Sequence, residues 1–269
     1  MFSETYALSI EETAYLLGYL GSADVAASFL KTTVGEMSAD NLTGRVTAAS
    51  HSLIARGLLS FDLASGESHL NPQLAHAVSV ILAADRTLRI DIAAPGQMER
   101  SITLFVAEKS GIIHELSYGV VSQFGLAPEG ELAAALVPHL GALPRTGGGT
   151  TAVGEVRGDR LERWRQYAAQ GRQATLVARL VETMDADDAT TLAGAMCNDR
   201  ATWISLVQLE ADGQGDAPLL AANHGIFVVQ ADTDSAWAFA TRLDDPMCLA
   251  VYRADRRVLA TLIGALLKR

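Results

Sequence analysis

Cysteine is scarce in this chain: only Cys197 and Cys248 occur among its 269 residues. Neither stands in a CxxC motif, whereas a disulfide framework or a cysteine-based metal cluster needs several cysteines at short spacings. Two isolated cysteines are typical of small buried hydrophobic side chains in a reducing compartment. The sequence therefore predicts no disulfide framework, no metal site and no cofactor.

Positive charge is also scarce. The chain holds 21 lysines and arginines against 31 aspartates and glutamates, a formal net charge of −10. Such a surface repels the phosphate backbone, so general nucleic-acid binding is not expected. No apolar run reaches the roughly 18 residues that a membrane span needs. The first residues carry acids where a signal peptide has a basic flank. We expect a cytoplasmic protein without membrane insertion.

Catalytic motifs are missing as well. The six histidines are scattered and no pair has the i,i+4 spacing of a helical metal site; they are His51, His69, His76, His114, His139 and His224. The acidic stretch ETMDADD (182–188) lacks the ligand spacing of a calcium loop. No GxSxG, HExxH or correctly placed GxGxxG occurs. The sequence predicts no catalytic residue and hence no enzyme, although a site assembled from distant residues stays open.

What the sequence does contain begins with a winged-helix-like order of elements. Ser9 is a suitable N-cap, and Glu11 and Glu12 follow it at the positive end of the helix dipole. Asn71-Pro72 is a second helix start. The predicted elements are helices from Ser9, over 23–31 and over 42–56, then a hairpin over 57–70 and a helix over 71–83.

A winged-helix module can bind DNA through its third helix, here Thr43–Arg56. Residues 1–80 carry three basic residues against eight acids, which is the wrong sign for a protein that enters a groove. A winged-helix transcriptional regulator is therefore the alternative hypothesis, and a protein-interaction scaffold is favoured over it.

An internal repeat runs through the rest of the chain. AADRTLRIDI (83–92) is similar to CNDRATWISL (197–206), so that Asp85-Arg86 recurs as Asp199-Arg200 at an offset of 114 residues. AEKSGII (107–113) matches AANHGIF (221–227) at the same offset. Coincidence in a chain rich in alanine, leucine and valine is the alternative, but the constant offset favours duplication.

Each copy of the repeat combines a helix, an antiparallel meander and a closing amphipathic helix. The first copy covers about 72–140 and the second about 186–267. Apolar residues alternate with a period of two in the expected strands, which lie at 87–94, 101–108, 111–117, 118–124, 202–210, 218–222, 225–231, 235–242 and 247–252.

We predict an α+β fold with two pseudo-twofold-related subdomains, each an antiparallel meander with flanking helices, preceded by the winged-helix-like segment. The expected divisions are an N-terminal subdomain over 1–143, a Gly-rich linker over 144–158 and a C-terminal subdomain over 159–269.

Protein recognition is the function that these observations favour. A rigid sheet can hold apolar loop tips against a helical partner. The candidate loops are 94–100, 122–130 and 211–217, and the candidate partner-binding residues are Met98, Phe124 and Leu126.

Four stretches in this order resemble those of a known family: LSIEETAYLLGYLG (8–21), SLIARGLLSFD (52–62), LNPQLAHAVSVILAADRTLRIDI (70–92) and GELAAALVPHLG (130–141). They resemble the EspG family, the cytosolic chaperones of actinobacterial type VII secretion. The resemblance implies two α+β subdomains related by pseudo-twofold symmetry. It also implies a chaperone that shields the apolar helical tip of a secreted PE–PPE-like partner, keeps it soluble and helps to sort it to one secretion machine. No individual functional residue is carried over.

Overall fold

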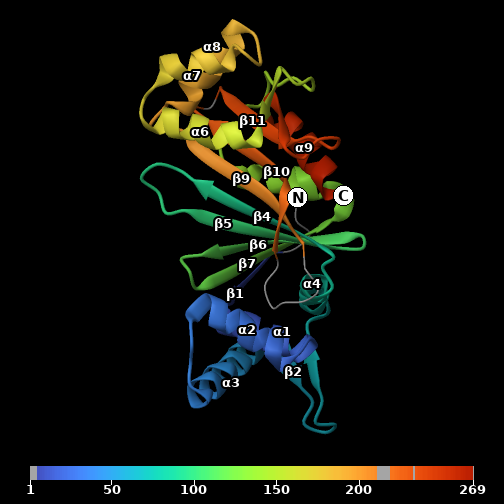
Figure 1. Cartoon of the computed structure of the whole chain (residues 1–269). Helices are drawn as coiled ribbons and strands as arrows, with labels where there is room; N and C mark the ends of the chain where they lie inside the picture. The colour runs from blue at the N-terminus through green and yellow to red at the C-terminus, as the bar shows by residue number, and fades with distance from the viewer. Residues whose placement is uncertain (1–4, 211–218, 233, 269) are drawn as a thin grey trace. The chain divides into compact units, whose positions relative to one another are not determined.

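The computed structural model of this chain describes residues 5–210, 219–232 and 234–268 (Figure 1). Its contacts divide the chain into two compact units. Unit 1 comprises the residues up to Asp85 together with Ile102–Glu129, and unit 2 comprises Arg86–Ser101 together with Gly130–Arg269. Both units combine helices with antiparallel strands, so the predicted α+β class is confirmed.

Unit 1 begins with a short strand and then follows the predicted winged-helix-like order. The Ser9 side chain accepts from the backbone N–H of Glu12, and Glu12 accepts from the backbone N–H of Ser9, which forms a capping box. Asn71 caps the fourth helix, with Pro72 in its first turn. The elements are β1 (Thr5–Ser9), α1 (Ile10–Leu20), α2 (Ala23–Val34), α3 (Ala39–Ala55), β2 (Leu59–Phe61), β3 (Ser68–Leu70) and α4 (Pro72–Leu82).

The sheet of unit 1 has the strand order β1-β7-β6-β5, where β5 is Arg100–Ala107, β6 is Ser110–Ser117 and β7 is Val121–Pro128. Sequence reasoning missed β1, which pairs with β7 on its outer side. Side chains from α1, α3, α4 and the sheet meet in one apolar core, which includes Leu16, Leu53, Leu74, Ile112 and Phe124. Burial of these side chains stabilises the unit, because the core is dominated by aliphatic surface removed from water.

Unit 2 contains the strand order β4-β9-β10-β11-β12-β8. The strands are β4 (Arg86–Ala93), β8 (Gly154–Arg157), β9 (Thr202–Glu210), β10 (Leu219–Gln230), β11 (Ala236–Thr241) and β12 (Cys248–Arg253). The helices are α5 (Leu132–Leu136, extended by 3-10 turns at Glu129–Glu131 and Val137–Leu140), α6 (Gly158–Ala169), α7 (Gln173–Leu180), α8 (Ala186–Met196) and α9 (Arg256–Leu267).

The two faces of this sheet are covered by different helices. Helices α6, α7 and α8 pack over one face, where Trp164, Leu180 and Leu192 join Trp237 and Phe239 of β11 in a core. Helix α9 contacts β10 and α5, and it buries its own apolar side at Leu259 and Ile263. Successive side chains along a strand point to opposite faces of the sheet. One face therefore packs against α6, α7 and α8, and the other packs against α9.

The last residues of the expected Gly-rich linker are not irregular. Gly154–Arg157 forms β8, which pairs with β12. A Cβ on Gly154 would lie 2.8 Å from the Thr183 carbonyl oxygen. This close approach of two backbones explains a glycine that the sequence pattern assigned to low complexity.

The repeated strings have different structural outcomes. Strands β4 and β9 pair antiparallel, with Asp91 opposite Ser205, and these two residues are also separated by the repeat offset. If β4 and β9 are equivalent strands of two repeat copies, a local twofold axis between them would place Asp91 opposite Ser205, as observed. By contrast, 107–113 crosses the turn between β5 and β6, whereas 221–227 lies within β10. The match of that second pair of strings does not reflect equivalent positions in the strands.

Candidate functional site

The three residues predicted to bind a partner occupy different environments. Met98 lies between β4 and β5 and is 83% exposed. Phe124 and Leu126 lie in β7, so the expectation of a loop over 122–130 is wrong for most of that range. Phe124 is 3% exposed, and its ring stacks on His114 at a centroid distance of 4.8 Å. The loop over 211–217 lies outside the described residues.

The reason for this misplacement is the turn that precedes β7. Tyr118 and Gly119 both have positive φ, 55° and 69°, and form a tight turn between β6 and β7. The strand therefore starts at Val121, later than its apolar pattern suggested, and continues to Pro128. Its pairing with both β1 and β6 turns Phe124 into the core of unit 1.

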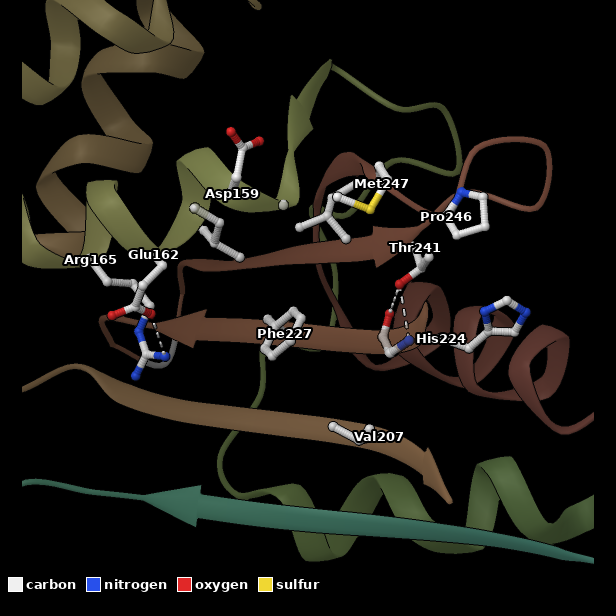
Figure 2. A pocket seen from close by; sticks show the side chains of 13 residues that line it. Asp159, Glu162, Arg165, Val207, His224, Phe227, Thr241, Pro246 and Met247 are labelled. Atoms are coloured by element: carbon white, nitrogen blue, oxygen red, sulfur yellow. Dashed lines mark hydrogen bonds and ion pairs between the residues drawn. The ribbon is translucent and has the colours of Figure 1, made fainter. Parts of the chain in front are cut away.

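A better candidate site lies in unit 2, on the sheet face that α6 covers (Figure 2). There a pocket of about 350 Å³ opens between the first turns of α6, the sheet and the loop that joins β11 to β12. Its apolar lining comes from α6, from three strands and from that loop, through Leu161, Val207, Phe227, Leu249, Pro246 and Met247.

The pocket exists because the neighbouring residues Val207, Gly225 and Thr241, on three adjacent strands, have small side chains or none. Gly225 pairs with Val207 on one side, and Thr241 follows on the other. A Cβ at Gly225 would lie 2.9 Å from the Leu206 carbonyl oxygen, so the position requires glycine. Without a side chain there, the apolar layer beneath α6 is interrupted and leaves a hollow.

Thr241 forms hydrogen bonds to the backbone of Gly225, next to a shift in strand register. The register between β9 and β10 shifts between Leu220 and Gly225. The Thr241 hydroxyl accepts from the Gly225 N–H and donates to the Gly225 carbonyl, both at 3.0 Å (Figure 2). Because a buried backbone group without a partner is unfavourable, this hydroxyl stabilises the bulged backbone beside the pocket.

The loop over 242–247, between β11 and β12, is held by charged groups. The Arg242 guanidinium donates to both carboxylate oxygens of Asp244, at 2.9 and 2.6 Å, and also pairs with Glu155. Hydrogen bonding from Arg242 lowers the pKa of Asp244, and hydrogen bonds from Cys248 and from the Met247 backbone lower the pKa of Asp245. These carboxylates therefore stay ionised over a wide pH range and remain paired with the groups around them.

This loop presents two apolar side chains to solvent. Leu243 is 74% exposed and Met247 is 51% exposed. Met247 lines the pocket under α6, while Leu243 lines a second hollow of about 370 Å³ on the opposite face of the sheet, with Leu262 and Leu266 of α9. Both side chains are therefore available to be covered by an apolar ligand.

The charged groups at the pocket all come from one helix. Asp159, Glu162 and Arg165 come from α6, and Arg165 pairs with Glu162 at 3.6 Å (Figure 2). His224 also lines the pocket, and its buried Nδ1 has no hydrogen-bond partner among the described residues. No group of His, Cys, Asp and Glu in the described part of the chain could hold a metal ion. The lining of the pocket is thus mostly apolar, with charged groups supplied by α6.

Sequence reasoning missed this site for a physical reason. The signal in RLDDPMC (242–248) is a turn with two acids and a proline, and its two apolar residues are scattered singly. Single exposed apolar residues are common on surfaces. Only the sheet brings Leu243 and Met247 next to hollows lined by residues from other strands and helices.

Comparison with known proteins finds structural similarity without a match in sequence. No protein-family model matches this chain, and no curated protein matches it in sequence. Its fold is similar to that of the type VII secretion system chaperone EspG5 of Mycobacterium tuberculosis, solved in complex with a PE25–PPE41 dimer. The TM-score is 0.63 at 13% identity, and the similarity covers 98% of this chain and 96% of that chain.

At this identity the likeness shows the fold. The architecture expected from the resemblance to the EspG family is confirmed at that level, as a distant similarity over nearly the whole chain. In the described residues no helix is long and apolar enough to cross a membrane.

Proposed function

We propose that this protein is a cytosolic chaperone that binds the apolar helical tip of a secreted partner, of the PE–PPE type, and keeps it soluble until export. The observation that carries the proposal is the pocket under α6 with the exposed Met247 at its edge, on a loop that also carries the exposed Leu243. The fold similarity to a secretion chaperone over 98% of the chain supports the same class of function.

The physical basis is complementary apolar surface. Covering a leucine or methionine side chain stabilises a complex by about 1.5–3 kcal/mol when its burial becomes complete. The helix end would enter the pocket against Phe227 and Val207, while Met247 packs along its side. In a secreted helical protein such a tip, left uncovered, is prone to aggregation.

The alternative of DNA binding receives no support from unit 1. The three basic residues among residues 1–80 all form ion pairs with acids: Lys31 with Glu36, Arg45 with Glu11, and Arg56 with Glu12. A helix that binds the phosphate backbone needs cations available for phosphates. Here each cation already has an acidic neighbour.

The experiment is co-expression with a PE–PPE-type heterodimer, with the fraction of soluble partner as the readout. We expect the wild-type chain to keep the partner soluble and to co-elute with it on gel filtration. The double variant Leu243→Ser with Met247→Ser should lose most of this effect, because it removes both exposed apolar side chains of the 242–247 loop, of which Met247 lines the pocket.

The matched control is Leu63→Ser in the hairpin of unit 1, since Leu63 is 90% exposed and lies far from the pocket in the sequence. It should behave as the wild type. A double variant that solubilises the partner as well as the wild type would contradict the proposed site. A wild-type chain without effect on any such heterodimer would contradict the proposed function.

A further inference from the structure

An arginine-rich surface on α6 and α7 departs from the acidic character of the chain. Between Arg157 and Glu182 the sequence holds six arginines against three acids, although the whole chain has a net charge of −10. On α6, Arg160, Arg163 and Tyr167 follow one another at helical spacings of three and four residues, so they lie on one side of the helix. Three of the six arginines, Arg160, Arg163 and Arg179, gather on this surface together with one acid, Glu182.

Part of this surface is a cleft. A hollow of about 220 Å³ is lined by Arg160, Arg163, Trp164, Tyr167, Arg179 and Glu182. Trp164 is 3% exposed and forms its apolar floor, and Arg172 lies 4.6 Å from the centroid of the Tyr167 ring at its side. The cleft thus combines several guanidinium groups with aromatic surface.

One carboxylate already lies in this cleft. Glu182 follows α7, and its two oxygens face different arginines: Arg179 at 2.9 Å and Arg160 at 3.9 Å. Arg163 lines the same cleft, and among the described residues it forms no ion pair with an acid. Guanidinium groups bind carboxylates in forked geometry, and an arginine cluster is a common means of recognising acidic peptide segments.

We propose that the cleft between α6 and α7 binds an acidic segment of a protein partner, and that Glu182 occupies the place of the partner's carboxylate until it binds. Arg163 and Arg160 receive the incoming carboxylate, and Trp164 and Tyr167 contact the apolar side chain next to it. This surface is separate from the apolar pocket that Met247 lines, so the inference does not depend on the proposed chaperone function.

The contact that Glu182 makes gives the proposal a directional test. Exposed ion pairs of this kind are worth about 0.2–1 kcal/mol. When the Glu182 carboxylate is removed, an acidic ligand no longer has to displace it from the arginines, and its binding should improve by a similar free energy. Glu182→Gln should therefore bind an acidic ligand more tightly than the wild type, by up to about fivefold. Arg163→Gln should bind it about fivefold more weakly, since one charge-assisted contact is lost.

The test is fluorescence anisotropy with a fluorescein-labelled peptide in which glutamates alternate with leucine and phenylalanine, and with the same peptide carrying glutamine in place of each glutamate. Arg257→Gln, an exposed arginine on α9, is the control for the same change of charge elsewhere. We expect binding of the glutamate peptide only, weakened by salt and unchanged in Arg257→Gln.

Three results would overturn the proposal. The glutamine peptide could bind as well as the glutamate peptide, which would remove the role of charge. Arg163→Gln could bind the peptide like the wild type, or Arg257→Gln could lose as much affinity as Arg163→Gln. Either result would show that the cleft is not the binding site. Glu182→Gln could fail to gain affinity, which would remove the internal competitor. Because Arg163 and Glu182 are exposed, both variants should fold, and circular dichroism checks this directly.

Discussion

Glu12 shows how one side chain joins three parts of unit 1. It is 3% exposed, yet it carries a carboxylate that accepts from the Ser9 N–H, from the Ser52 hydroxyl and from the Arg56 guanidinium, at 2.8, 2.8 and 2.7 Å. The start of α1 is thereby tied to the end of α3. Sequence reasoning found Glu12 as a helix-start acid but could not find Ser52 and Arg56, because those contacts span 40 and 44 residues.

Replacement of Glu12 by glutamine should destabilise the protein by about 1.5–3 kcal/mol, since it removes the charge from a buried group that accepts hydrogen bonds, while the half-exposed Arg56 guanidinium can still be solvated. The measurement is the free energy of unfolding in urea. Glu11→Gln is the matched control, because Glu11 pairs with Arg45 at a more exposed place and should change the free energy by about 1 kcal/mol or less. Equal effects of the two substitutions would contradict this account.

His114 makes the stability of the protein depend on pH. Its ring stacks on Phe124 and its Nε2 lies 3.1 Å from the Ser122 hydroxyl. Burial lowers the pKa of His114 from 6.5 to about 4, partly opposed by the charge of Glu115. The folded state therefore disfavours the protonated ring more than the unfolded state does.

The His114 contribution is constant above pH 6.5 and is lost as the pH falls from 6.5 towards about 4. The loss is about 1.4 kcal/mol for each pH unit in that window, or about 2 kcal/mol at pH 5. In the wild type, the free energy of unfolding should fall between pH 7.5 and pH 5. In His114→Gln, which has no imidazole to titrate at this position, that fall should be smaller by about 2 kcal/mol. An identical pH dependence in the variant and the wild type would show that His114 is not the group responsible.

At the scale of elements, β10 is the strand whose irregularity creates the pocket. A Cβ at Gly225 would lie too close to the Leu206 carbonyl oxygen. If the backbone moved to relieve this contact, the hydrogen bonds between Gly225 and the Thr241 hydroxyl would be weakened. Gly225→Ala should therefore destabilise unit 2 by about 1–3 kcal/mol and narrow the pocket.

Gly264→Ala in α9 is the control with the opposite sign. A Cβ there would meet only Ala133 at 3.9 Å, an ordinary contact. Alanine in a helix interior is more favourable than glycine by about 0.5–1 kcal/mol, so this variant should be more stable than the wild type. Thermal unfolding measures both changes. A Gly225→Ala variant as stable as the wild type would remove the steric explanation of the pocket.

Helices were easier to predict than strand boundaries for local reasons. Ser9 and Asn71 cap the helices that they were expected to cap, because capping depends on a few neighbouring residues. The strands β1 and β8 were missed, since each is short and is stabilised by pairing with a distant strand, β7 or β12. Their backbone partners lie more than 90 residues away in the chain.

For the molecule as a whole, charge makes a clear prediction about nucleic acid. A net charge of −10 and the pairing of the basic residues in unit 1 should prevent binding of mixed-sequence duplex DNA even at low salt. An electrophoretic mobility assay across rising protein concentration checks this. Micromolar affinity that falls steeply with salt would favour the winged-helix regulator instead.

The duplicated architecture also belongs to this scale, and it stays a prediction. The chain order β1, helices, β4–β7, α5 is followed by β8, helices, β9–β12, α9. In each unit the strand that precedes the helices pairs with the last strand of the meander, β1 with β7 and β8 with β12. Together with the pairing of Asp91 and Ser205, this supports descent from one repeated α+β unit.

By itself, the sequence determined the α+β class, the first helices and their caps, and the acidic surface, because these depend on local periodicity, capping groups and composition. The tertiary structure alone decided that Phe124 is a core residue, that Gly225 leaves a hollow in a sheet, and that Glu182 lies among arginines of another helix. The physical reason is that strand pairing and side-chain packing join residues far apart in the chain, and no local pattern records which distant residues will meet.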